Sequence, residues 1–187
     1  ASLGLMMLAE PMISTLFQYN EFGVHDVAMA GRSLMAYSLG LLGFILVKVL
    51  VPGFTSRKDM KTPVRFGIYA MIANMFLNLI LVFPLAHAGL ALATSLGAFF
   101  NASLLLFALL KSGIYLPSIG WRIYILRIIL ATASMTALLY HFVDASLWLQ
   151  WGLADRALNL AMWVGSGGAL YAAVLLLSGL RLKHLST

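Results

Sequence analysis

The amino-acid sequence predicts an all-α protein, a polytopic bundle of membrane-spanning helices. Hydrophobic residues make up 62% of the chain. Charged residues make up 10%, whereas soluble domains average about 25%. Residues 66–110 form a run of 45 without Asp, Glu, Lys or Arg, and residues 157–180 form another run of 24. Because about 20 apolar residues cross the hydrocarbon core of a bilayer, the longer run is long enough to cross twice.

Six membrane helices follow from the apolar runs and from the residues that break them. The first is interrupted by Glu10-Pro11 and is short for a full span, as expected of a chain that was cut or that continues from an upstream segment. A short basic tail, residues 181–187, follows the last helix. The six helices are expected over residues 2–17, 27–51, 63–83, 90–111, 121–143 and 156–180.

The second and third helices have recognisable end signals. Asp26 is a plausible N-cap for the second helix, because a carboxylate accepts a hydrogen bond from a free N–H of the first turn. Pro52-Gly53 is expected to end that helix. Thr62-Pro63 is expected to open the third helix as an N-cap followed by a proline in the first helical position. A tight turn over residues 84–89 then leads into the fourth helix.

The basic residues give the orientation independently. If successive loops alternate between the two sides of the membrane, only Arg32 and Arg156 fall on one side, and the other ten of the 12 Lys and Arg fall on the opposite side. Loops rich in Lys and Arg stay in the cytoplasm, so we expect the even-numbered helices and the C-terminus to end there. The ten are Lys48, Arg57, Lys58, Lys61, Arg65, Lys111, Arg122, Arg127, Arg181 and Lys183.

Several classes of function are not indicated. The net charge of +6 does not indicate a nucleic-acid partner, because the basic residues lie at the ends of apolar runs and not in one patch. The chain has no Cys, and its four His fall at predicted helix ends without metal-ligand spacing. The sequence lacks paired carboxylates, a Ser/His/Asp set and a phosphate-cradling Gly loop. An enzyme is therefore not expected.

Polar side chains at membrane depth suggest a cation site. Asn74 and Asn78 are four residues apart and share one helix face. Asn78 and Thr94 are each eight residues from the turn near residue 86, so they lie at similar depth, with Asn74 one turn deeper near Gly97. Together with the carbonyl of Leu90, they offer the hard oxygen ligands that suit a Na⁺-like cation. The alternative is routine hydrogen bonding that holds the helices together, and no carboxylate of this chain completes the site.

Four charged residues are candidates for a substrate or gate role. Glu10 lies in the apolar part of the first helix, and a carboxylate at membrane depth is a functional candidate. Its true depth depends on whether the first helix is complete. Arg57, Lys58 and Lys61 fall in a cytoplasmic loop, where each can attract anionic lipid headgroups by roughly 1 kcal/mol. The alternative for these three is that they only set the topology.

One run of the sequence resembles a known family. Residues 52–63, PGFTSRKDMKTP, resemble the loop after the tenth membrane helix of MurJ/MviN-type lipid II flippases, where Pro-Gly-Phe precedes a basic segment and Asp-x-Lys-Thr-Pro. The likeness extends over about residues 14–105, and beyond that it is one of helix count and length. Shorter matches lie at residues 16–19, 36–41, 87–90 and 101–105.

The resemblance implies helices nine to fourteen of a fourteen-helix transporter of the multidrug/oligosaccharidyl-lipid/polysaccharide exporter superfamily. It implies a bacterial inner-membrane protein that flips a lipid-linked peptidoglycan precursor, lipid II, by alternating access. Residues 1–111 would form the second half of the C-terminal lobe. Residues 112–187 would form the cytoplasmic tail and the last two helices, which in the family form a groove for the polyprenyl tail.

The resemblance also implies partners and an energy source. The partners are lipid II or a related polyprenyl-linked lipid, membrane lipids, and the missing N-terminal half, which holds most of the phosphate-binding cations. Coupling to Na⁺ or to the membrane potential favours the cation site at Asn74, Asn78 and Thr94, with a carboxylate from the missing seventh helix. Two alternatives stay open: another polysaccharide-lipid or drug exporter of the superfamily, and a non-transporting scaffold subunit. A cavity at these polar residues would favour transport.

Overall fold

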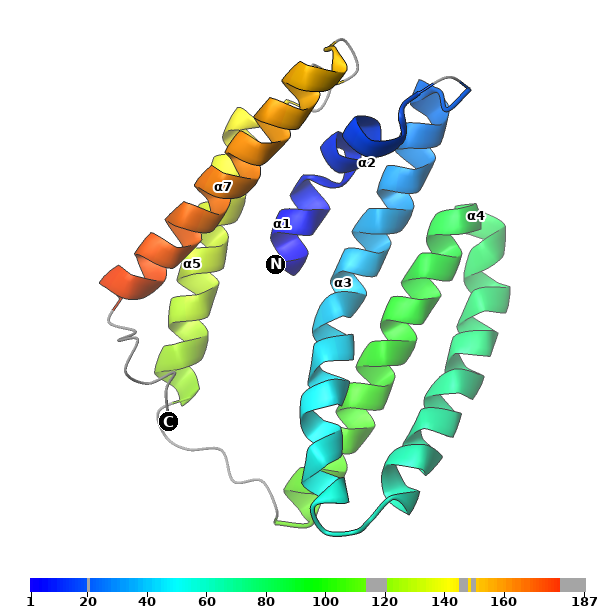
Figure 1. Cartoon of the computed structure of the whole chain (residues 1–187). Helices are drawn as coiled ribbons and strands as arrows, with labels where there is room; N and C mark the ends of the chain where they lie inside the picture. Colours follow the sequence, from blue (N-terminus) through cyan, green and yellow to red (C-terminus); the bar gives the residue numbers. More distant parts are fainter. Residues whose placement is uncertain (20, 114–120, 145–147, 149–150, 179–187) are drawn as a thin grey trace.

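The computed structural model is a bundle of α-helices, and the residues that it describes contain no strand (Figure 1). It describes residues 1–19, 21–113, 121–144, 148 and 151–178. The basic tail, with Arg181 and Lys183, lies outside the described residues, as does the side chain of Arg122. The helices are α1 (Ser2–Met7), α2 (Ala9–Phe17), α3 (Val24–Thr55), α4 (Lys61–Lys111), α5 (Trp121–Phe142) and α7 (Leu153–Leu177).

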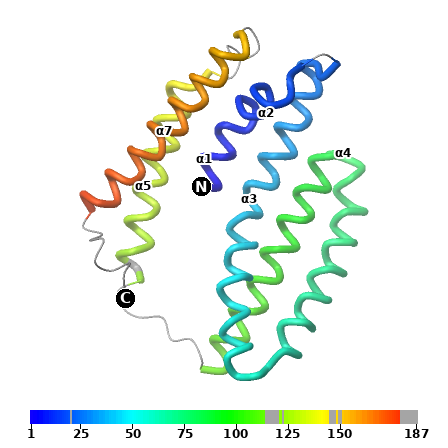
Figure 2. The backbone as a smooth tube through the Cα atoms, viewed as in Figure 1, coloured from blue at the N-terminus to red at the C-terminus, as the bar shows by residue number. Residues whose placement is uncertain are grey.

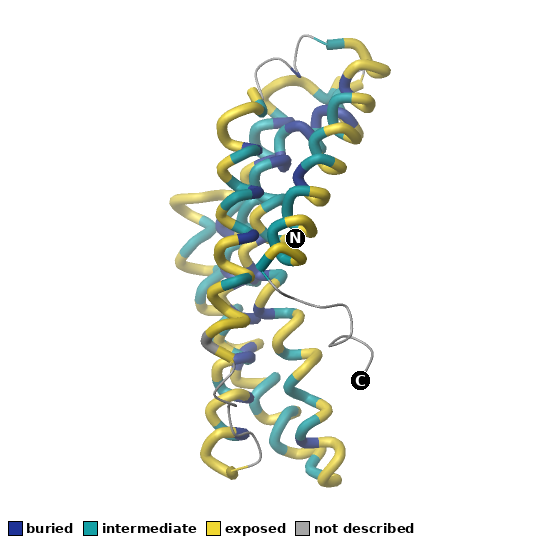
Figure 3. The backbone as a smooth tube through the Cα atoms, turned by 90° about the vertical axis from the view of Figure 1, so that its left-hand side faces the viewer, coloured by how far each residue is buried: buried dark blue, intermediate teal, exposed yellow. Residues whose placement is uncertain are grey.

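Four of these helices, α3, α4, α5 and α7, are long and apolar enough to cross a membrane. At Ala86, where φ is 46° and ψ is −124°, α4 folds back on itself. Figure 1 shows its two arms, residues 61–85 and 87–111, side by side. Figure 3 shows exposed residues along the length of the bundle, and many of the exposed residues are large and apolar, such as Phe83, which is 87% exposed. Such a surface suits hydrocarbon as the solvent, and the predicted class of an all-α membrane bundle is confirmed.

The first predicted helix is two short helices, and the break is not at Glu10-Pro11 as predicted. The chain bends at Leu8, where φ is −98° and ψ is 11°. Pro11 lies in the first turn of α2, where the missing N–H of a proline is tolerated. Because Pro11 has no N–H to donate to the carbonyl of Met7, the interruption at Leu8 falls three residues before the proline.

The second predicted helix runs past Pro52-Gly53, so that predicted stop is wrong by one turn. In the structure α3 continues to Thr55. Phe54 is only 4% exposed and packs against Leu105 and Leu109 of α4. Burying a large aromatic side chain stabilises by about 1.5–3 kcal/mol, which is enough to hold the last turn after a proline.

Two aspartates cap helices, in positions other than those predicted. Asp26 lies inside the first turn of α3, where its Oδ2 accepts a hydrogen bond from the N–H of Gly23 at 2.9 Å. It is therefore the inner partner of a capping box, and Gly23 is the cap residue. At the start of α4, Asp59 Oδ1 accepts a hydrogen bond from the N–H of Thr62 at 3.1 Å. Asp59 thus takes the capping role that was expected of Thr62.

The second arm of α4 packs against α3 through small residues. Ser95 Oγ donates a hydrogen bond to the carbonyl of Ala36 at 2.6 Å, across the two helices. A Cβ added to Gly40 would lie 2.8 Å from Ser95 Cα, and one added to Gly43 would lie 2.9 Å from Phe99 N. The two helices therefore approach as closely as glycine allows, which is typical of helix packing in membranes.

The split helix α1–α2 lies between α3 and the pair α5–α7, as Figures 1 and 2 show. Leu8 packs with Met135 and Leu139 of α5 in an apolar cluster. Arg156, in the first turn of α7, is only 8% exposed, and its Nη1 donates a hydrogen bond to the carbonyl of Ser14 at 3.2 Å. This cation sits at the C-terminal end of α2, where the helix dipole favours positive charge.

Candidate functional site

The polar residues of α4 lie between its two arms. Asn78 Nδ2 donates a hydrogen bond to Asn74 Oδ1 at 2.6 Å, as their spacing of four residues allows. Asn74 packs against Gly97 of the opposite arm, where an added Cβ would lie 3.2 Å from Asn74 Cβ. The α4 hairpin therefore brings Asn74 against Gly97 of the second arm, the neighbour that the sequence predicted for it.

A cavity of about 280 Å³ opens beside this pair. Asn74, Thr94 and Asn101 line it together with apolar residues of α3 and α4. The side-chain oxygens of Asn78 and Asn101 are buried and have no hydrogen-bond partner. Such oxygens are rare in proteins because each unpaired buried acceptor costs about 1–3 kcal/mol. Asn78 itself does not line the cavity, but its side chain donates a hydrogen bond to Asn74, which does.

The arrangement offers neutral oxygen ligands. The hydroxyl of Thr94 donates to the carbonyl of Leu90 at 2.9 Å, so its oxygen still has lone pairs to accept or to coordinate. The residues that line the cavity include no carboxylate. The set suits a singly charged hard cation, and a negative charge for it would have to come from outside these residues.

The loop between α3 and α4 carries the three predicted gate cations. Arg57, Lys58 and Lys61 are exposed, at the end of α3 away from Glu10. Lys58 has a φ of 59°, and the N–H groups of Lys58 and Asp59 donate to the carbonyls of Thr55 and Phe54 at 2.9 and 3.1 Å. This is a Schellman motif, in which glycine normally takes the position of Lys58.

Lys58 therefore permits a test that separates charge from backbone geometry. Both Lys58→Gly and Lys58→Ala remove the cation, but only glycine relieves the left-handed backbone. We expect Lys58→Gly to be more stable than Lys58→Ala by about 1 kcal/mol, seen as a higher apparent Tm of the full-length protein. Equal Tm values would mean that the turn is not held in this conformation. If transport falls equally in both variants, the loss is due to charge.

Asp59 gives the loop a pH dependence. Hydrogen bonds from the side chain and then the backbone N–H of Thr62 hold the pKa of Asp59 below its ordinary value. The ionised carboxylate is the favoured form, so the cap is present above the ordinary pKa of about 3.9 and is lost as the pH falls through the lowered value. We expect Asp59→Ala to speed hydrogen exchange at Thr62 at pH 6. The difference from the parent should vanish in strong acid, and a difference that persists there would contradict the cap.

Glu10 lies apart from the other candidates. It occupies the first turn of α2 and packs on α3, where a Cβ added to Gly31 would lie 2.8 Å from Glu10 Cγ. Within the described part of the chain its side chain has no hydrogen bond or ion pair. The N-terminal end of a helix favours a carboxylate. Glu10 is thus half-buried at a helix break, and the structure does not place it with the loop cations or with the asparagines.

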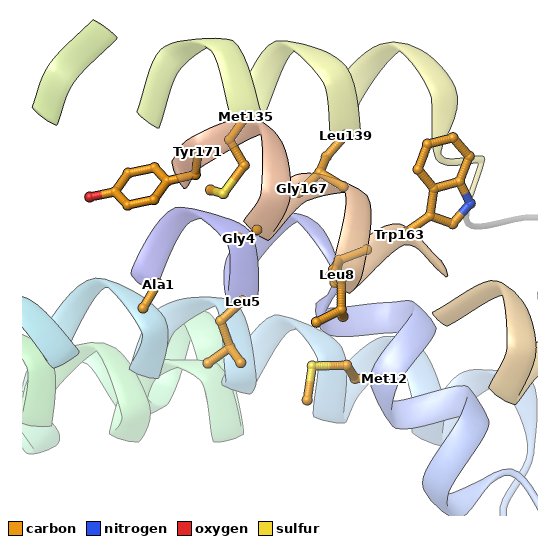
Figure 4. Close-up of a pocket in the computed structure, with 12 residues that line it drawn as sticks. Ala1, Gly4, Leu5, Leu8, Met12, Met135, Leu139, Trp163, Gly167 and Tyr171 are labelled. Atoms are coloured by element: carbon orange, nitrogen blue, oxygen red, sulfur yellow. The ribbon is translucent and has the colours of Figure 1, made fainter. Parts of the chain in front are cut away.

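An apolar cavity of about 370 Å³ lies between α1–α2, α5 and α7 (Figure 4). Three glycines line it, and a Cβ added to Gly167 would meet Met135 at 3.6 Å. The small residues leave the space that larger side chains would fill. The larger lining residues are Leu5, Leu8, Met12, Met135, Leu139, Trp163 and Tyr171.

A sequence model of a family described as lipid II flippase MurJ matches residues 1–162. The chain belongs to the MurJ family. The match includes the whole α4 hairpin, the loop with the Schellman motif and most of the residues that line the apolar cavity. The resemblance expected from residues 52–63 is therefore confirmed.

Individual MurJ relatives agree with the family match. The probable lipid II flippase MurJ of Vibrio cholerae is 48% identical over 186 residues, which cover 99% of this chain and 35% of that protein. The probable lipid II flippase MurJ of Haemophilus influenzae is 37% identical, over 100% of this chain and 37% of that protein. The lipid II flippase MurJ of Burkholderia cenocepacia is 39% identical, over a stretch that covers 75% of this chain and 27% of that protein. The chain thus spans about a third of the length of these relatives.

Sequence reasoning missed two residues of interest in this MurJ-family chain. Asn101 was not among the predicted cation-site residues, but it lines the cavity beside Asn74. Its position on the face of Thr94 and Gly97 was the available signal. Arg156 was expected as the first residue of the last helix, on the side with few basic residues, but it is buried against α2. A lone arginine at a helix start gives no sign in the sequence that it is buried.

Proposed function

We propose that this chain is the C-terminal part of a transporter that moves lipid II across the bacterial inner membrane by alternating access. The observation that carries the proposal is the apolar cavity between α1–α2, α5 and α7 in a chain of the MurJ family. A polyprenyl tail needs an apolar surface at membrane depth, and this cavity is lined almost entirely by hydrocarbon. The function is transport, and the chain catalyses no bond making or breaking.

The proposed orientation places the loop with Arg57, Lys58 and Lys61, together with the C-terminus, in the cytoplasm. Support comes from ten of the 12 basic residues falling on that side. The three cations then stand where the anionic substrate enters the membrane protein. Glu10 packs near the opposite end of α3. Movement of α1–α2 would therefore change its surroundings, whereas movement of the loop between α3 and α4 would not.

The cavity beside Asn74 and Thr94 is proposed to bind Na⁺ and to couple its gradient to flipping. The unpaired amide oxygen of Asn101, which lines the cavity, supports this, because a cation bound there would satisfy that acceptor. Tight packing in this place would have favoured a scaffold subunit. A carboxylate from the N-terminal half of the full-length transporter would supply the missing negative charge.

The test is the amount of lipid II accessible at the outer face of cells depleted of their own flippase. The cells carry the full-length parent, intact or with Asn78→Ala. A matched control is Asn159→Ala on α7, because Asn159 does not line this cavity and its amide donates to the carbonyl of Asp155 at 2.9 Å. The intact parent and the control should restore outward lipid II, and Asn78→Ala should not, at equal protein levels.

The outcomes separate the substrate from the cation site. If the parent is well expressed but restores no outward lipid II, lipid II is not the substrate. A parent that works equally well with Asn78→Ala would leave the flippase in place and remove the cation site, making the asparagines simple interhelical contacts.

A further inference from the structure

A third, polar cavity lies at the end of the molecule where α3 begins and α4 turns. Its volume is about 370 Å³, and its lining includes His25 and Arg32 of α3 and His87 of the α4 turn. A neighbouring hollow of about 250 Å³ shares His87 with it. We call these two together the outer cavity, because the proposed orientation places them on the outer side of the membrane.

The basic side chains of the outer cavity are available to a ligand. His25, Arg32 and His87 are exposed, and none of their side chains has a hydrogen bond or ion pair with another described residue. Asp26 also lines the outer cavity, but its carboxylate already accepts the N–H of Gly23. Within the described part of the chain, no carboxylate is therefore paired with these basic side chains.

The donors have the chemistry of a phosphate site. A guanidinium presents a planar fork of N–H donors that matches two phosphate oxygens. An imidazole supplies one N–H when neutral and two when protonated. Two imidazoles and a guanidinium around one cavity can donate to several oxygens of one anion, which a cation or an apolar ligand would not require.

The backbone fixes this arrangement. Ala86 holds a φ of 46°, a conformation that costs a residue other than glycine about 1–3 kcal/mol and is kept where surrounding structure imposes it. A Cβ added to Gly89 would lie 2.6 Å from the carbonyl carbon of Leu81, so the two arms touch at the turn. The turn therefore presents His87 to α3 on a rigid support.

We propose that the outer cavity binds a phosphate or pyrophosphate group. This inference rests on the proposed function for the source of the group, which is the pyrophosphate of the transported lipid on its arrival at the outer leaflet. Free phosphate in solution has the same chemistry and is the other source. The outer cavity would hold the headgroup while the polyprenyl tail leaves the apolar cavity between α1–α2, α5 and α7.

The experiment measures the protection of histidines in the full-length parent, held in phosphatidylcholine nanodiscs. Diethyl pyrocarbonate modifies exposed imidazoles, and mass spectrometry gives its rate at each histidine. Inorganic pyrophosphate should slow modification of His25 and His87 but not of His141, which is exposed at the end of α5. Arg32→Gln should raise the pyrophosphate concentration that protects by about tenfold, as expected for loss of a charged hydrogen bond.

A matched control is Arg65→Gln, which removes the same charge from an exposed position at the start of α4 and should change nothing. A second variant, His87→Gln, changes the α4 turn instead of α3 and should also weaken the protection of His25. Because the two variants change different helices, misfolding of one of them cannot decide the result. Absence of protection in the parent, or equal protection with Arg32→Gln at unchanged Tm, would overturn the proposal.

Farnesyl pyrophosphate distinguishes the two sources. If it protects at lower concentration than inorganic pyrophosphate, the lipid-linked group is the ligand. If only inorganic pyrophosphate protects, the lipid part of the proposal is wrong. A parent that shows protection but moves no lipid II would refute the proposed function and leave the anion site standing.

Discussion

Gly40→Ala should destabilise the full-length protein by about 1–3 kcal/mol, the usual result of forcing a methyl group into a filled contact. The new Cβ would lie 2.8 Å from Ser95 Cα, and a backbone cannot yield as a flexible side chain can. The two helices would have to separate. That separation would also weaken the hydrogen bond from Ser95 to the carbonyl of Ala36.

The control for Gly40 is Gly165→Ala on α7. No atom lies within 4 Å of a Cβ added to Gly165, so this variant should gain about 0.5–1 kcal/mol from the better helix propensity of alanine. The two substitutions are chemically identical and should shift the apparent Tm in opposite directions. A rise in Tm for Gly40→Ala would show that α3 and α4 are not in this close contact.

Arg156→Met should be the second severe change. Hydrogen bonds to charged groups contribute about 1.5–3 kcal/mol, and Met preserves most of the apolar stem while it removes the bond to the carbonyl of Ser14. We expect a lower Tm and faster hydrogen exchange at Gln18, whose N–H donates to the same carbonyl at 3.3 Å. Arg65→Met, at an exposed position, should leave both measurements unchanged.

The two measurements for Arg156 separate its local role from a global one. A fall in Tm without faster exchange in α2 would mean that Arg156 stabilises α7 by contacts other than that with Ser14. No change in either would mean that the buried guanidinium contributes nothing to holding α7 on α2.

The fold class was predictable because the bilayer sets the length of each apolar run. The run of 45 uncharged residues with a turn signal near its middle became the α4 hairpin. Helix ends were less predictable, because they depend on packing between helices. Phe54 packs against α4, and α3 therefore continues to Thr55, beyond Pro52. The break at Leu8 follows from the hydrogen bond that Pro11 cannot make, so the helix is interrupted three residues upstream of the proline.

The candidate site divides in the same way. The pair Asn74 and Asn78 was predictable from helical spacing on one element. The grouping of His25, Arg32 and His87 was not, because it depends on which helix ends lie side by side. Residues 25 and 87 are far apart in the chain, and only the packing of α4 on α3 brings them to one cavity.

The apolar cavity takes its walls from both ends of the chain. Leu5, Leu8 and Met12 come from the first two helices, and Met135 and Gly167 come from the last two. If only α5 and α7 were exchanged between two relatives, these helices would come from one protein and α1–α2 from the other. The side chains that line the cavity would then no longer be matched to one another. A chimaera meant to transfer specificity for a lipid chain must carry residues 1–17 along with the last two helices.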